Sequence, residues 1–269
     1  MCIRDRIWTR GGKAAIWTLF ALVVAVVFVA PIATVVIAGF AGSWTGPLPS
    51  NLGFNHFQDA LSDENVASLS VSLQTAFIAG ALALLLGTWA ALAVRTAARP
   101  LQRVVDAVFH LPIAVPSVAI GLGLLISFNE KPLLLGGTKW IVIIAHTVLV
   151  LAFAFSTVSA ALDRLDPAYA QAAESLGAGP ARVLTRVTLP LLLPSLGAAA
   201  GLAVALSMGE LGATIMVYPA TWKTLPVTIF GLSDRGQVFS AAACTSVLLA
   251  ATLIALALLS RIRGKAALR

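Results

Sequence analysis

The sequence predicts an all-α, polytopic membrane protein, and its composition and apolar runs are the main reasons. Of its 269 residues, 59% are hydrophobic and only 11% are charged, and the mean hydropathy is +0.95. A soluble domain of this size does not need so much apolar surface. Six apolar runs are long enough to cross about 30 Å of hydrocarbon as helices. We therefore expect a bundle of six transmembrane helices.

The first three spans follow a short, basic N-terminal segment, residues 1–13. The first apolar run, 14–40, is longer than the apolar core of a cleaved signal peptide, which predicts a retained membrane helix. The second and third spans are expected at 69–94 and 104–128, joined by a short basic loop.

The last three spans are expected at 140–162, 191–217 and 239–260, before a basic tail, residues 261–269. Between the last two spans, residues 218–236 are apolar but interrupted by Pro and Gly. This segment fits a short re-entrant or interfacial element, and an ordinary extracytoplasmic loop is the alternative.

The basic residues predict the orientation of the spans. The chain has 18 Lys and Arg residues, and all of them fall on one side of the predicted topology except Lys131, Lys139, Lys223 and Arg235. Loops rich in Lys and Arg stay on the cytoplasmic side. Both termini, and the loop between the fourth and fifth spans, are therefore expected in the cytoplasm.

That loop has the pattern of two short helices separated by a turn. Asp166 can cap a first helix, and Gly177 supplies a residue that tolerates the left-handed conformation that ends it. A second helix can begin at Pro180 behind Gly179, because the missing N–H of proline has no partner in a first turn anyway. Pro190 is expected to break or kink this second helix where the chain re-enters the membrane.

The segment QAAESLGAGPARVLTRVTLP resembles the EAA loop of permease subunits in ABC importers that work with a binding protein. That pattern is Glu-Ala-Ala, three residues, Gly, nine residues, then an aliphatic residue, any residue, Leu and Pro. The positions that match are Ala172, Ala173, Gly177, Val187, Leu189 and Pro190. The departure is Gln171, which stands where the pattern has Glu, although Glu174 follows one helical turn later.

The resemblance implies a fold, a mechanism and a set of partners. It implies the type I importer permease fold, with the permease domain at 67–260, in a bacterial inner membrane. In this family the loop is a coupling helix that docks in a cytoplasmic ATPase, so the chain would bind no cofactor itself and its partner would use ATP. The expected partners are an ATPase dimer, a second permease subunit (a copy or a paralogue) and a periplasmic binding protein. The residues implied in coupling are Gln171, Ala172, Ala173, Glu174, Leu176, Gly177, Ala178, Gly179, Val187, Leu189 and Pro190.

The segment SMGELGATIMVYPATWKTLPVTIFGLSDRG is similar to the permeases of 2-aminoethylphosphonate importers. This branch lies near the sulfate, molybdate and iron(III) permeases, which stay open as alternative substrate classes. An ATP-independent channel is the competitor from another class, and it would not need the EAA-type loop.

Glu210 is the only acidic residue deep in a predicted span. A carboxylate at the bilayer centre costs about 2.5–3.5 kcal/mol on insertion scales, so this one is expected to face protein or a wet cavity. It is either a gate residue on the translocation path or a hydrogen-bonded residue between packed helices. Gly209 and Gly212 beside it favour close packing or local unwinding.

Pro112 and Pro116 predict a kinked third span, which either lines the path or only packs. His146, in the fourth span, is expected to be a hydrogen-bonded polar residue rather than a proton relay.

Other functions find no support in the sequence. The chain has no GxxxxGK[ST] phosphate-binding loop and no HExxH, so neither an ATPase nor a zinc protease is predicted. Cys2 and Cys244 are far apart and show no metal-ligand spacing, and no metal site is expected. The basic residues are spread over short loops without interleaved aromatics, which argues against nucleic-acid binding.

Overall fold

The structure is a computed structural model that describes residues 10–95 and 97–266. Within these ranges the regular secondary structure is helical, apart from an isolated bridge between Ser43 and Ser50, and loops join the helices. The segments expected to be cytoplasmic, 1–13 and 261–269, lie partly outside the described residues. The chain divides into two units, one of residues 10–62 and 232–247 and the other of residues 63–231 and 248–266.

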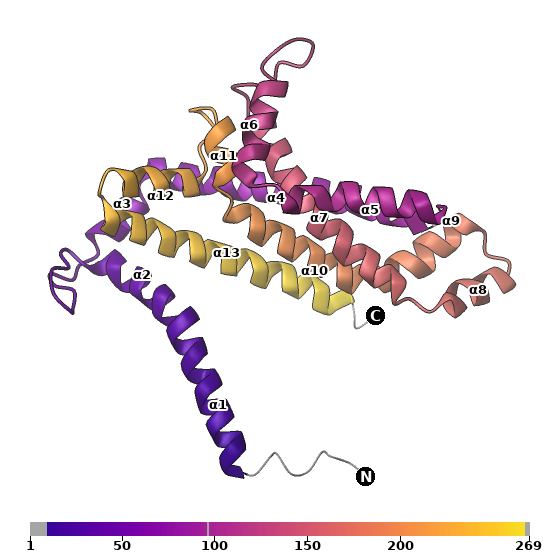
Figure 1. Ribbon diagram of the computed structural model, residues 1–269, viewed down its shortest axis with the longest axis horizontal. Helices are drawn as coiled ribbons and strands as arrows, with labels where there is room; N and C mark the ends of the chain where they lie inside the picture. The colour runs from indigo at the N-terminus through magenta and orange to yellow at the C-terminus, as the bar shows by residue number, and fades with distance from the viewer. Residues whose placement is uncertain (1–9, 96, 267–269) are drawn as a thin grey trace. The chain divides into compact units, whose positions relative to one another are not determined.

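The first unit contains the first expected span as one helical run (Figure 1). α1 (Arg10–Val24), the π-turn η2 (Ala25–Val29) and α2 (Ala30–Phe40) follow one another without a break. The π-turn precedes Pro31, and the Ala30 N–H bonds to the Ala25 carbonyl, five residues back. The short α3 (Asn55–Ala60) packs on α2, where a Cβ at Gly39 would lie only 3.0 Å from the Phe57 ring.

The core of the second unit is built from three long helices, α4 (Asp63–Arg95), α7 (Lys139–Asp163) and α10 (Leu189–Met208). Small residues line their contacts. A Cβ at Gly87 on α4 would lie 2.9 Å from the backbone nitrogen of Phe155 on α7, so glycine lets the two backbones approach. The part of α13 (Val238–Ala266) that belongs to this unit packs on α4 and α10 through Ala255.

The third expected span, 104–128, is broken rather than kinked, which corrects the expectation of one helix. α5 (Arg99–Ala114) and α6 (Ser117–Ser127) meet at an angle of 105°. Val115 has an extended backbone (φ −101°, ψ 132°), because a residue before proline avoids the helical region, and Pro116 is the N-cap of α6. Pro112 lies inside α5, and the helix continues to Ala114.

The fifth expected span, 191–217, is also divided differently. The helix begins at Pro180, with α9 (Pro180–Val183) and the π-turn η3 (Leu184–Thr188) leading into α10, and it ends at Met208. After three non-helical residues, α11 (Gly212–Val217) follows. The sequence predicted that Pro190 breaks or kinks the helix; the helix does not break there, and Pro190 follows the π-turn in which the Leu189 N–H bonds to the Leu184 carbonyl.

The unit also contains the short helix α8 (Pro167–Ser175) and most of α12 (Leu225–Asp234), whose residues 232–234 belong to the first unit. α12 lies within the segment 218–236, and residues just before and inside it form hydrogen bonds with a stripe of hydroxyls on α4. The bonds run from Trp222 Nε1 to Thr75 Oγ1 (2.9 Å), from Leu225 N to Ser72 Oγ (2.8 Å) and from Thr228 Oγ1 to Ser68 Oγ (3.2 Å).

Five helical runs among the described residues are long and apolar enough to cross a membrane. Counting the bent pair α5–α6 as one span makes six. This agrees with the all-α fold and the number of spans predicted from the sequence.

Candidate functional site

α8 begins and ends as the sequence predicts. Asp166 Oδ1 accepts the Ala168 N–H at 2.9 Å and caps the first turn. At the other end Gly177 has φ +85°, and two backbone bonds close the last turn: Gly177 N to Glu174 O (2.9 Å) and Ala178 N to Ala173 O (3.1 Å). This pair of bonds is a Schellman motif, which needs the left-handed residue that glycine supplies.

An apolar face of α8 is exposed. Tyr169 is 57% exposed and Leu176 is 90% exposed, and with Ala172 and Ala173 they recur at helical spacing on one side. We call these four residues the α8 face. Leu176 lies almost wholly outside the fold, beside two alanines that leave the helix surface bare of long side chains.

The other residues of the EAA-type motif divide into exposed and packed groups. Gln171 and Glu174 are exposed on α8, and Gly179, with an extended backbone, is the exposed N-cap of α9. The packed group, half-buried where the chain returns to the helical core, consists of Ala178, Val187 and Leu189, followed by the exposed Pro190. The first half of the motif therefore lies on the exposed helix α8, and its second half lies where the chain returns to the helical core.

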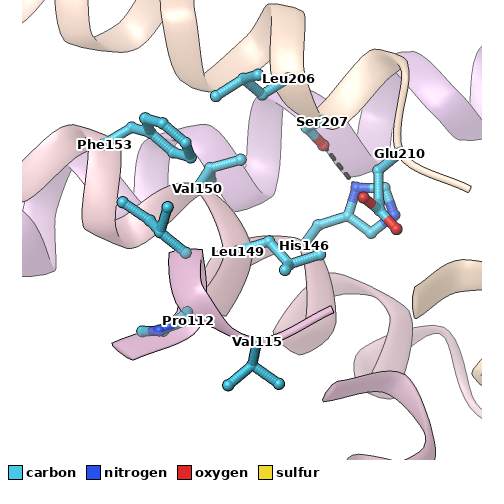
Figure 2. Close-up of a pocket in the computed structure, with 10 residues that line it drawn as sticks. Pro112, Val115, His146, Leu149, Val150, Phe153, Leu206, Ser207 and Glu210 are labelled. Atoms are coloured by element: carbon cyan, nitrogen blue, oxygen red, sulfur yellow. Dashed lines mark hydrogen bonds between the residues drawn. The ribbon is translucent and has the colours of Figure 1, made fainter. Parts of the chain in front are cut away.

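A cavity of about 210 Å³ lies where α5, α7 and α10 meet, beside both helix breaks (Figure 2). Its polar groups, from His146, Ser207 and Glu210, gather at one end. Its apolar lining consists of Pro112, Ile113, Val115, Leu149, Val150, Phe153 and Leu206.

The structure brings Pro112 and Glu210 together at this cavity, but not the other residues predicted for the path. Pro116 caps α6 instead. Gly212 packs against Ser117 of α6, and Gly209 is exposed at the end of α10.

Glu210 is part-buried and has a defined hydrogen-bonding role. Its Oε1 accepts the Ala213 N–H at 2.6 Å, in the first turn of α11, and its own carbonyl accepts the Thr214 hydroxyl at 3.4 Å. A carboxylate at a helix N-terminus is favoured by the unpaired N–H groups there. The same carboxyl group therefore lines the cavity and holds the helix that follows the break.

His146 is buried and hydrogen-bonded, as expected from the sequence. Its Nδ1 lies 2.7 Å from Ser207 Oγ and its Nε2 lies 2.8 Å from Thr214 Oγ1. Sequence reasoning did not single out Ser207 and Thr214. The available signal was a hydroxyl residue on each side of Glu210, but their partner lies more than 60 residues away.

Within the described ranges, no group of three or more His, Cys, Asp or Glu side chains could hold a metal ion. The fold is that of a polytopic membrane protein, with a cavity among candidate spanning helices and an exposed, capped helix between two of them.

Comparison with known proteins identifies the family. Residues 83–265 match the binding-protein-dependent transport system inner membrane component, and the chain belongs to this family of multi-pass inner-membrane permease subunits. It is 46% identical over 256 residues to PhnV of Salmonella typhimurium, a protein named as a 2-aminoethylphosphonate transport system permease, with 95% of this chain and 97% of that protein covered.

More distant relatives include two Escherichia coli K12 permeases. The molybdenum transport permease ModB is 31% identical over 64% of this chain and 81% of its own length. The sulfate transport permease CysT is 32% identical over 71% of this chain and 74% of its own length.

Solved structures share the fold. A bacterial ABC transporter that imports alginate superposes with a TM-score of 0.69 at 17% identity, covering 93% of this chain and 96% of that one. The methionine ABC transporter MetNI, in an inward-facing conformation, gives 0.64 at 18% identity over 77% of this chain and 99% of that one. The chain therefore has the fold of ABC importer permeases, as the sequence predicted.

Proposed function

We propose that this permease subunit imports 2-aminoethylphosphonate. The main support is the 46% sequence identity to relatives named for that substrate, which covers 95% of this chain and 97% of theirs. The molybdenum and sulfate permeases match at 31–32% over shorter stretches. Because this chain is more similar to the phosphonate permeases than to the molybdenum and sulfate permeases, a phosphonate is the substrate class that we propose.

The α8 face is the surface on which the ATPase docks. Its exposed apolar side chains are presented on a helix of nine residues, roughly 14 Å long, that is capped at both ends. Since the chain carries no phosphate-binding loop, ATP is bound and hydrolysed by the partner. Closure of the ATPase dimer would bring two α8 helices together and rock the spans between inward- and outward-open states.

The complete transporter contains further subunits. Six spans enclose half of a path, so a second permease, a copy or a paralogue, faces this one. A periplasmic binding protein delivers the substrate on the side opposite α8. In this arrangement both termini and α8 are cytoplasmic, which is the side the basic residues favour.

The cavity beside the two helix breaks is part of the translocation path, with Glu210 as its gate residue. Charged groups within a membrane mark substrate pathways because lipid does not tolerate them. Pro116, Gly209 and Gly212 lie at or next to the two breaks, where a discontinuous helix can hinge.

Uptake by cells tests this function. Cells that express the chain with its ATPase, second permease and binding protein are given labelled 2-aminoethylphosphonate, with unlabelled phosphonates, sulfate, molybdate or iron(III) as competitors. The proposal expects uptake that only phosphonates compete and that is lost without this chain. Transport of a competitor without phosphonate uptake would support the role of the chain as a permease but would contradict 2-aminoethylphosphonate as its substrate.

A further inference from the structure

The break between α10 and α11 is bridged by a side chain from a third helix. His146, on α7, is 1% exposed and contacts both sides of the break. Figure 2 shows its contact with Ser207. Its Nδ1 meets Ser207 in the last turn of α10, and its Nε2 meets Thr214 in the first turn of α11. The residues between these two hydroxyls include Glu210.

The hydrogen bonds can be ordered from donor to acceptor. The Thr214 hydroxyl lies 3.4 Å from the Glu210 carbonyl, which can only accept, so this hydroxyl donates there. The Thr214 oxygen is then free to accept from His146 Nε2–H at 2.8 Å. A neutral imidazole with its proton on Nε2 accepts at Nδ1, from the Ser207 hydroxyl at 2.7 Å. With the proton on Nδ1 instead, the donor and acceptor roles at the imidazole reverse, and in either tautomer His146 links the two hydroxyls.

α11 is held on another side by α6. A Cβ at Gly121 on α6 would lie 2.7 Å from the Ala213 carbonyl oxygen, so the two backbones are in direct contact. Gly212 contacts the side chain of Ser117 on α6. With α6 on one side and His146 on the other, α11 has little freedom to turn about the break.

His146 also joins the two helices that lead to α8. α7 ends at Asp163, three residues before the Asp166 cap, and the run α9–η3–α10 begins directly after the α8 loop. A displacement of α8 therefore acts on both helices. The bond between His146 and Ser207 links these helices again beside Glu210.

We propose that His146 is a positioning residue that fixes the α10–α11 break and so holds the Glu210 carboxyl group at the cavity wall during coupling. The role of Glu210 as a gate rests on the proposed function. We call the contact of His146 with Ser207 and Thr214 the clamp, and it rests on these two hydrogen bonds and on the burial of the imidazole.

The test measures the break directly in the assembled transporter in proteoliposomes. In a background with Cys2→Ser and Cys244→Ala, a Gly209→Cys reporter is added, because Gly209 is exposed and the nearest atom to its Cβ position is the Ala205 oxygen at 4.0 Å. The reaction rate of this thiol with a small charged methanethiosulfonate is compared between His146→Phe and Thr147→Val. Thr147 is the matched control, since its buried hydroxyl bonds only to its own helix, at Ile143 O.

We expect His146→Phe to label about tenfold faster than Thr147→Val, the ratio that two intramembrane hydrogen bonds would give. Without the reporter, His146→Phe should also lower phosphonate uptake per ATP hydrolysed about tenfold more than Thr147→Val, at equal amounts of assembled complex. Equal labelling rates, or equal losses of uptake per ATP, would overturn the clamp.

A second pair of variants covers the case in which His146→Phe does not assemble. Ser207→Ala removes the hydroxyl that His146 Nδ1 contacts, and Thr147→Val is again the control. Faster labelling in Ser207→Ala than in Thr147→Val supports the clamp, and equal rates overturn it. Failure of the proposed function would appear separately, as a wild-type transporter without ATP-driven phosphonate uptake, while the labelling difference persists.

Discussion

Replacing Gly177 by alanine should disturb the coupling helix through the backbone alone. Gly177 has φ +85°, and a Cβ there would meet nothing within 4 Å, so no steric contact contributes. An L-residue in this region costs about 1–2 kcal/mol. If the backbone leaves this conformation instead, the bonds from Gly177 N to Glu174 and from Ala178 N to Ala173 are lost. Either way, the equilibrium ratio of correctly ended to disturbed α8 falls roughly 5- to 30-fold.

The assay is the affinity of the ATPase subunit for the purified permease, together with ATP-driven uptake in proteoliposomes. We expect Gly177→Ala to weaken both by roughly the same 5- to 30-fold. Gly177→Asn should lose less, because asparagine enters the left-handed region more readily. Gly179→Ala is the matched control, since Gly179 also has open space but a φ of −72°, which alanine adopts. Equal losses for Gly177→Ala and Gly179→Ala would refute the reasoning.

Three further predictions concern the cavity, the contact between α4 and α12, and the α8 face. Glu210→Gln keeps an oxygen to cap α11 but removes the charge, so transport assays should show uptake reduced about tenfold or more at unchanged assembly; full uptake would favour a packing role. Ser72→Ala leaves the buried Leu225 N–H without its acceptor, which should cost about 1–3 kcal/mol in denaturant unfolding, whereas exposed Ser70→Ala should cost little. Leu176→Glu should weaken ATPase binding in pull-down without affecting membrane insertion, and unchanged binding would contradict the docking surface.

Local rules predicted α8 well because its ends depend on neighbours in the sequence. Asp166 as cap, Gly177 as the left-handed stop and Gly179 before Pro180 are all found as expected. Each of these effects acts over five residues or fewer, so the sequence contains the whole cause.

The helix breaks were only partly predictable. Pro116 indicated a disturbance in the third span, but a bend of 105° also needs α6 to pack on α11, which the sequence does not reveal. Pro190 indicated a break or a kink, and the structure instead continues the helix through the π-turn η3 directly before it, which the sequence did not indicate.

The partners of His146 could not be predicted either. The sequence indicated that this side chain needs polar contacts, since lipid does not satisfy it. Which hydroxyls supply those contacts follows from the register between α7 and α10, set by small residues such as Ala203 packing against Val150 and Ala154. That register arises from long-range packing.

The measurement that tests the account most directly is the uptake of labelled 2-aminoethylphosphonate into proteoliposomes that contain the complete transporter and its binding protein. ATP-driven import by this permease predicts uptake with ATP inside, none with a non-hydrolysable analogue, and none when this chain is omitted. Uptake that is independent of ATP would indicate a channel and would contradict ATP-driven import.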